Sequence, residues 1–378
     1  MANPNLNFPV TYPPEGVTSK FVNPPNHVLL AYTAVISSLA FSTFFSWFRF
    51  LVKLCIVRIT HAEDYFIPVA WLGAIGHATM AFLIYDFAPI IHGWDMRLET
   101  FGRYLLYFRL SALFYNISAL FLKVSMLVQI RRTFVPRGTQ PKTSYVLHFL
   151  IWANVLYYPT TMCLMMLNCR PLSKAWQPWL TGKCIDMGII ATSTASINLL
   201  SDLAILALTQ RVIWNIMRID KKQQLRLSVV FCAGVVPCGF AVLCLIFNVR
   251  MMNSSDFVFD AAIMGLACYG EITSGFFVLF LPVVLRFCSH IEKRFQQQKR
   301  ARAPSRLDFA DIGVDGMGSD TEERYEKSLW HISYTQKGGL EGSGEAVWHA
   351  SHAVVPGKDS REFGFEGSSL SSSESPDF

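Results

Sequence analysis

Charged residues are scarce over most of this 378-residue chain. Asp, Glu, Lys and Arg make up only 16% of the sequence, whereas 52% is hydrophobic. Soluble domains usually carry about 25% charged residues, and here the charges concentrate after residue 286. This composition excludes an ordinary soluble domain and indicates a protein that is embedded in a membrane for most of its length.

Several familiar motifs are also missing. The chain has no P-loop, no Rossmann glycine fingerprint, no His-Glu-x-x-His motif and no zinc-ligand spacing, so we expect no cofactor and no metal. Residues 1–27 are rich in Pro and Asn and lack the basic region and short apolar core of a cleavable signal peptide. We expect the first apolar segment to act as an uncleaved anchor.

Seven apolar segments are long enough to cross a bilayer as helices. A hydrocarbon core about 30 Å thick needs about 20 mostly apolar residues in a helix, and these runs are too long for barrel strands. The sequence predicts an all-α membrane protein, a seven-transmembrane helix bundle over residues 28–287, preceded by a short extracellular segment, 1–27. The predicted spans are Val28–Val52, Tyr65–Phe87, Tyr104–Ile130, Tyr145–Leu167, Gly188–Trp214, Leu227–Val249 and Val258–Phe287.

The basic residues of the linkers predict the orientation of the bundle. Lys and Arg gather in the first, third and fifth linkers and after the seventh span, and loops rich in these residues face the cytoplasm. We expect a multi-pass protein of the plasma membrane with its amino terminus outside and its carboxyl terminus in the cytoplasm.

Two features of the expected outer face concern covalent modification. Cys169 and Cys184 bracket the linker between the fourth and fifth spans. We predict a disulfide there, because disulfides persist outside the cell; two free thiols are the alternative. Asn253-Ser254-Ser255 is a glycosylation acceptor pattern on the same side, although so short a pattern also arises by chance. The other seven cysteines lie in or beside spans, and we interpret them as small packing residues.

The composition changes after the seventh span. Residues 286–306 hold seven basic residues and one acidic residue, and residues 307–378 hold five basic and fourteen acidic residues. We interpret residues 288–378 as a basic juxtamembrane segment suited to anionic lipids, followed by an acidic, Ser/Gly-rich, disordered cytoplasmic tail. Nucleic-acid binding is not expected of a basic segment beside a span. The loop 211–226 and the tail are candidate contacts for a cytoplasmic signalling partner.

A few polar residues within the spans are candidates for function. Asn198 and Asp202 are four residues apart and share one face of the fifth span. Glu271 lies near the middle of the seventh span, Lys123 lies in the third, and Asp64 opens the second. A carboxylate from the fifth or second span would neutralise Lys123, because pairing lowers the cost of a charge in lipid. The alternative is that the Lys123 ammonium snorkels to the headgroups.

Different interpretations stay open for these groups. Glu271 has three interpretations: a protonated carboxyl group that is only hydrogen-bonded, a residue that contacts a ligand, or a proton donor. We interpret Asn198 as a residue that forms hydrogen bonds between helices. For Asp202 we favour a functional role, because burying an Asp side chain costs more free energy than burying an Asn side chain. The polar interior would be extended by Asn116, Asn154 and His77.

One block of sequence carries the pattern of a known family. The stretch CRPLSKAWQPWLTGKCID precedes TSTASINLLSDLAILAL and RVIWNIMRIDKKQQLRLSVVFCAG. This order resembles the fungal rhodopsin-like heptahelical membrane proteins, which the chain would match over roughly residues 28–290. Gln210 departs from the pattern, which has Pro there, and the long Cys-rich outer domain of some relatives is absent. The matching residues are Cys169, Pro171, Trp176, Cys184, Asn198, Asp202, Phe231 and Gly234.

The resemblance implies a fold and a membrane rather than photochemistry. A retinal Schiff base needs a lysine amine in the last span, and residues 258–287 contain no lysine. The third and seventh spans end in QIRR and FLPVV, so the Asp-Arg-Tyr and Asn-Pro-x-x-Tyr switches of the best-known seven-span receptors do not apply.

Three functions follow from these observations. The leading hypothesis is a receptor-like sensor of an extracellular or lipophilic ligand, which is not an enzyme. The alternative is a membrane-embedded cyclase or isomerase of fungal secondary metabolism, with Glu271 or Asp202 as its general acid. The third is a transporter, against which stands an odd number of spans without an evident inverted repeat. The sequence leaves the ligand, the partner and the oligomeric state open.

Overall fold

The computed structural model describes residues 7–57, 61–134, 141–215 and 221–302. All of these residues belong to one unit, Met1–Pro304. The predicted segments 1–6 and 303–378, which include the acidic tail, lie outside the described residues.

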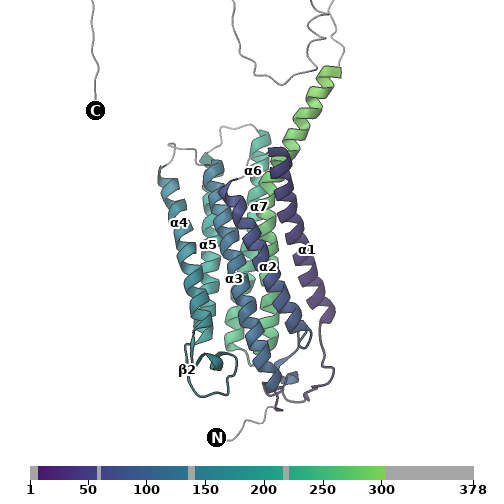
Figure 1. Ribbon diagram of the computed structural model, residues 1–378, viewed down its shortest axis with the longest axis vertical. Helices are drawn as coiled ribbons and strands as arrows, with labels where there is room; N and C mark the ends of the chain where they lie inside the picture. The colour runs from purple at the N-terminus through teal and green to yellow at the C-terminus, as the bar shows by residue number, and fades with distance from the viewer. Residues whose placement is uncertain (1–6, 58–60, 135–140, 216–220, 303–378) are drawn as a thin grey trace, which may run out of the picture. The chain divides into compact units, whose positions relative to one another are not determined.

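Seven long helices form a bundle, as the sequence predicts (Figure 1). Each helix is long and apolar enough to cross a membrane. The helices are α1 (Val28–Val52), α2 (Ala62–Tyr85), α3 (Leu98–Phe134), α4 (Pro141–Met166), α5 (Met187–Asn215), α6 (Lys221–Asn253) and α7 (Phe257–Arg302).

Three helices extend well beyond their predicted spans, among them α6, which begins at Lys221 rather than Leu227. Helix α3 begins at Leu98 rather than near Tyr104, and α7 continues past Phe287 to Arg302. Hydropathy reports the lipid-facing length of a helix, whereas these extensions carry charged residues that continue the helix in water. The basic juxtamembrane segment is therefore helical as far as Arg302.

Four prolines lie inside helices without ending them. Transmembrane helices tolerate proline, because neighbouring side chains and local adjustments satisfy the freed carbonyl groups. Helix α7 runs through Pro282 without interruption. The other three are Pro68, Pro159 and Pro237.

Helix α3 lies at the centre of the bundle. In its most apolar stretch 61% of the residues are buried, against 22% in α1 and in α4. It packs closely against α2, because a Cβ at Gly73 would lie 2.9 Å from the backbone nitrogen of Ser118. Small residues let helix backbones approach in membranes, where the hydrophobic effect does not drive helix association.

The two ends of the bundle differ in the elements that connect the helices. At the end where the amino-terminal segment lies (lower part of Figure 1), a short hairpin of β1 (Cys169–Arg170) and β2 (Lys183–Cys184) joins α4 to α5. We call residues 168–186 the lid and this end the lid end. The opposite end, beyond which α7 extends, is the tail end. The short helices are η1 (Lys53–Val57) at the tail end, and η2 (Gly93–Asp95) and η3 (Leu172–Ala175) at the lid end.

Candidate functional site

A buried ion pair joins α3 to α5. The Nζ atom of Lys123 is 2.6 Å from Oδ1 of Asp202, and both side chains are less than a tenth exposed. Nζ also donates a hydrogen bond to the main-chain oxygen of Asn198, at 2.8 Å. Of the two carboxylate partners that the sequence suggests for Lys123, the structure selects the one in the fifth span. Paired in this way, the ammonium group lies inside the bundle and does not reach the headgroups.

Glu271 from α7 is hydrogen-bonded beside this pair. Its Oε1 accepts from Nδ2 of Asn198 at 2.7 Å, and its Oε2 accepts from the hydroxyl of Tyr115 at 2.7 Å. The Tyr158 hydroxyl donates to Oδ1 of Asn198 at 2.5 Å. Six side chains from α3, α4, α5 and α7 thus form one network, which we call the central cluster: Tyr115, Lys123, Tyr158, Asn198, Asp202 and Glu271.

The local sequence explains why these side chains meet. Asn198 and Asp202 are one helical turn apart and project from one face of α5. Because α5 begins after the lid and runs toward the tail end, Asp202 lies nearer the tail end. Next to Glu271, Gly270 allows α6 to approach α7, because a Cβ there would lie 2.2 Å from the Phe240 ring. Tyr158, which is buried, and Tyr115, which is partly buried, are network members that sequence reasoning missed. The sequence does not distinguish these two tyrosines from the others in the chain, and only their hydrogen-bond partners show that they belong to the network.

Asp64 belongs to a second cluster, at the tail end. Its Oδ1 is 2.6 Å from Nζ of Lys53 and 3.1 Å from Nη2 of Arg49. Glu63 is 3.4 Å from Lys53 and also contacts Arg132. The sequence placed Asp64 near Lys123, but the structure separates them. Arg49 and Lys53 were missed; they are four residues apart at the end of α1, a spacing that could have shown a shared face.

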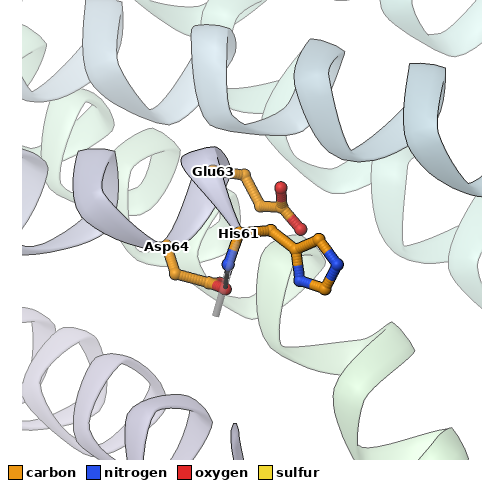
Figure 2. A group of neighbouring side chains, drawn as sticks. All are labelled: His61, Glu63 and Asp64. Atoms are coloured by element: carbon orange, nitrogen blue, oxygen red, sulfur yellow. Dashed lines mark hydrogen bonds between the residues drawn. The ribbon is translucent and has the colours of Figure 1, made fainter. Parts of the chain in front are cut away.

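The tail-end cluster, defined as Arg49, Lys53, Glu63, Asp64 and Arg132, includes carboxylates that a metal could use. His61, Glu63 and Asp64 lie at the start of α2 (Figure 2), with one ligand atom from each within 4.8 Å of the others. However, Asp64 also accepts a hydrogen bond from the His61 main-chain nitrogen, at 3.0 Å. Both carboxylates face cations already, and an incoming metal would have to displace them. We therefore interpret the trio as part of an ion-pair cluster.

A cavity of about 330 Å³ opens at the lid end of the bundle, between the lid, α2, α3, α5, α6 and α7. Its walls are largely apolar, and Tyr115 and Asn198 line it toward the centre of the bundle. Glu271 does not line it and lies behind these two side chains. A volume of this size suits a small organic ligand. Aromatic residues of the wall are Tyr85, Tyr104, Phe108, Phe257 and Tyr269.

Two cysteine thiols also line the cavity. The Sγ atoms of Cys244 and Cys268 are 3.6 Å apart, and both residues are buried. Cys238 is buried as well, as the packing interpretation expects. The remaining free cysteines are exposed, which differs from that interpretation: Cys55, Cys163, Cys232 and Cys288.

The lid is held against the bundle by one arginine of α3. Nε of Arg109 donates to the main-chain oxygen of Ala175 at 3.0 Å, and Nη1 donates to Oδ1 of Asn168 at 3.0 Å. The hairpin brings the sulfur atoms of Cys169 and Cys184 within bonding distance, 2.12 Å. This makes the pair a disulfide candidate across the base of the lid.

Two other predicted sites have a defined position. Asn253 is the last residue of α6, at the lid end; it is exposed, and its Nδ2 donates to the main-chain oxygen of Val249 at 3.0 Å. Its glycosylation stays a prediction. Of the predicted loop 211–226, residues 211–215 belong to α5 and 221–226 to α6, and residues 216–220 lie outside the described residues.

The comparisons with known proteins agree with this architecture. The family model for the fungal rhodopsin domain matches residues 48–290. Fugralins biosynthesis cluster protein 2 of Gibberella zeae is 27% identical over 327 residues, which cover 84% of this chain and 81% of that protein. A SAT4 family membrane protein of Emericella nidulans is 32% identical over 144 residues, which cover 38% of this chain and 36% of that protein. No solved structure matches the chain.

Proposed function

The chain belongs to the fungal rhodopsin domain family, and from that premise we propose that it is a receptor-like sensor of a lipophilic ligand bound in the lid-end cavity. The contact between the cavity and the central cluster is the observation that carries the proposal. Tyr115 and Asn198 line the cavity and also hydrogen-bond the two oxygens of Glu271. A ligand that moves either side chain would disturb hydrogen bonds shared by four helices.

The orientation of the bundle is part of the proposal. The linkers at the tail end carry most of the basic residues, which supports a cytoplasmic tail end and a lid that faces outward from the plasma membrane. Ligand would then enter from outside or from the outer leaflet. The loop 211–226 and the tail would contact a signalling partner in the cytoplasm.

The position of Glu271 supports sensing over direct catalysis. A general acid must lie within hydrogen-bond reach of the atom that it protonates. Glu271 does not line the cavity, and both of its oxygens already accept hydrogen bonds. Asn198 instead connects the cavity to the Lys123–Asp202 pair, which lies nearer the tail end. This connection offers a route by which binding changes the packing at the other end of the bundle.

A reporter at the tail end tests the sensor directly. Gln297 is an exposed residue of α7, and an environment-sensitive fluorescent amino acid there would report movement of the helix. We expect an organic-solvent extract of the source organism's culture to change its emission in nanodiscs. Asn198→Leu and the milder Tyr115→Phe should abolish the change. Ser196→Ala is the matched control, because Ser196 lies on α5, does not line the cavity and bonds only within its helix. An unchanged emission with the wild-type protein contradicts the proposal.

A membrane-embedded enzyme is the second candidate, and one contact favours it. The Tyr115 hydroxyl lines the cavity and donates to Glu271, so it could protonate a bound substrate. The tyrosinate left on Tyr115 would take back the proton released by ring closure or a double-bond shift, which leaves the proton count unchanged. The Gibberella zeae relative is named for a biosynthesis cluster, which fits such a reaction.

The enzyme predicts a product that the sensor does not. Membranes that contain the wild-type protein would convert a component of the culture extract to an isomer of the same mass and different chromatographic retention. Tyr115→Phe would abolish the conversion. Identical chromatograms with wild-type, variant and empty membranes exclude this candidate.

A further inference from the structure

Three residues that line the lid-end cavity each carry a buried polar atom that has no hydrogen-bond partner among the described residues. The atoms are Nε2 of His77, Oδ1 of Asn116 and Oδ1 of Asn248. The three residues are only 5%, 1% and 7% exposed. A buried polar atom that is left unpaired costs free energy. Because all three residues line one cavity, a ligand that reaches these atoms from it would satisfy them.

The hydrogen bonds of the two asparagines show which atom of each side chain remains without a partner. Nδ2 of Asn116 donates to the main-chain oxygen of Ala112 at 2.8 Å, and Nδ2 of Asn248 donates to that of Cys244 at 3.0 Å. A carbonyl oxygen only accepts, so the NH₂ group of each amide must face it. Each asparagine therefore keeps its own carbonyl oxygen, an acceptor, for the cavity.

The histidine offers an acceptor by the same reasoning. Nδ1 of His77 is 3.0 Å from the main-chain oxygen of Ser111. Nδ1 is also 2.8 Å from Oγ of Ser111. The main-chain oxygen only accepts, whereas the hydroxyl can accept or donate, so a hydrogen atom on Nδ1 is the assignment that satisfies both contacts. In the neutral ring Nε2 is then an acceptor. The Tyr269 ring, 4.5 Å away between centroids, holds the imidazole in place.

Charged groups do not compete with these acceptors. Arg109 lines the cavity, but its guanidinium group donates to Ala175, Met165 and Asn168. Asp186, the only carboxylate among the described lining residues, is exposed at the rim. An anionic ligand would meet three acceptors that cannot donate to it, and Nε and Nη1 of Arg109 already donate to the protein. A cationic ligand would lack a buried counter-ion.

We infer that the cavity recognises an uncharged, lipophilic ring system with hydroxyl groups on at least two of its sides, which donate to Asn116, Asn248 and His77. This inference rests on the proposed function, because it specifies the ligand class of the same cavity. The aromatic wall contacts the rings, and the three acceptors select hydroxylated molecules over their ethers. A site built to hydrogen-bond a hydroxyl group discriminates strongly against an analogue that cannot donate.

Matched probes test the ligand class on the full chain in nanodiscs. The probes are naphthalene diols and anthracene diols, each beside its dimethyl ether, with bound probe measured by equilibrium dialysis. We expect a diol to bind at least about tenfold more tightly than its ether. Asn116→Leu and Asn248→Leu should each weaken diol binding about tenfold and leave ether binding unchanged. The comparison of diol with ether needs no variant, so it holds even if a variant fails to fold.

Asn154→Leu is the matched control for the asparagine variants. Asn154 also donates to the carbonyl oxygen four residues earlier, at 2.7 Å, but its Oδ1 accepts from Ser201 at 3.0 Å and it does not line the cavity. Diol affinity should be unchanged in this variant. Ethers that bind as tightly as diols, or diols that do not bind, overturn the inference. The sensor is judged separately by the Gln297 reporter and the culture extract, whose response does not depend on this ligand class.

Discussion

Replacing the Lys123–Asp202 pair one residue at a time should destabilise the bundle far more than replacing both. The two side chains are 2.6 Å apart and almost fully buried. Lys123→Met leaves a buried carboxylate without its counter-ion, and Asp202→Leu leaves a buried ammonium. Each single change should cost about 3–5 kcal/mol of unfolding free energy. The double variant removes both charges, and we expect it to lie within about 1 kcal/mol of the wild type, because apolar replacements of buried ion pairs are often neutral.

Thermal unfolding in nanodiscs, followed by tryptophan fluorescence, measures this difference. Each single variant should lower the melting temperature by on the order of 10 °C, at about 2–4 °C per kcal/mol for a domain of this size class, and the double variant should recover most of the loss. A double variant as unstable as the sum of the two singles would refute the pairing. A neutral Lys123→Met would indicate instead that the ammonium snorkels to the headgroups.

Three further predictions concern the lid and the packing of α7. Under denaturing, non-reducing conditions an alkylating reagent should label seven of the nine cysteines; reduction should expose two more thiols and Cys169→Ser only that of Cys184, and nine labels without reduction contradict the bridge. Gly270→Ala should cost about 1–3 kcal/mol, because its Cβ would lie 2.2 Å from the Phe240 ring, whereas Gly239→Ala meets no atom within 4 Å; equal melting temperatures contradict the contact. Arg109→Met frees Ala175 and Asn168 from their donor, so trypsin should cleave the lid faster, and an unchanged rate argues against this anchor.

The spans and the lid could be predicted from the sequence because their signals are local. A run of about 20 apolar residues identifies a membrane helix wherever its neighbours lie. Cys169 and Cys184 lie in one linker on the expected outer face, where disulfides persist. Hydropathy could not predict the full lengths of α3 and α7. A helix that continues beyond its apolar stretch loses the hydropathy signal, although its backbone hydrogen bonds continue.

The polar interior was predictable only in part. The cost of an isolated charge requires a partner for Lys123, but the choice between Asp202 and Asp64 depends on which helices are neighbours. Asp64 instead meets Arg49 of α1 and Lys53 of η1, and the sequence does not show that these helices are neighbours. Asn248 gave no signal, because a single asparagine in an apolar helix does not show which way it faces.

A high-resolution cryo-EM map of the protein, purified in nanodiscs from its source organism, tests the central claim most directly. The account predicts non-protein density in the lid-end cavity, with polar atoms at hydrogen-bond distance from Oδ1 of Asn116 and Oδ1 of Asn248. A cavity that is closed by its own side chains, or one in which only water molecules meet these two oxygens, would contradict it.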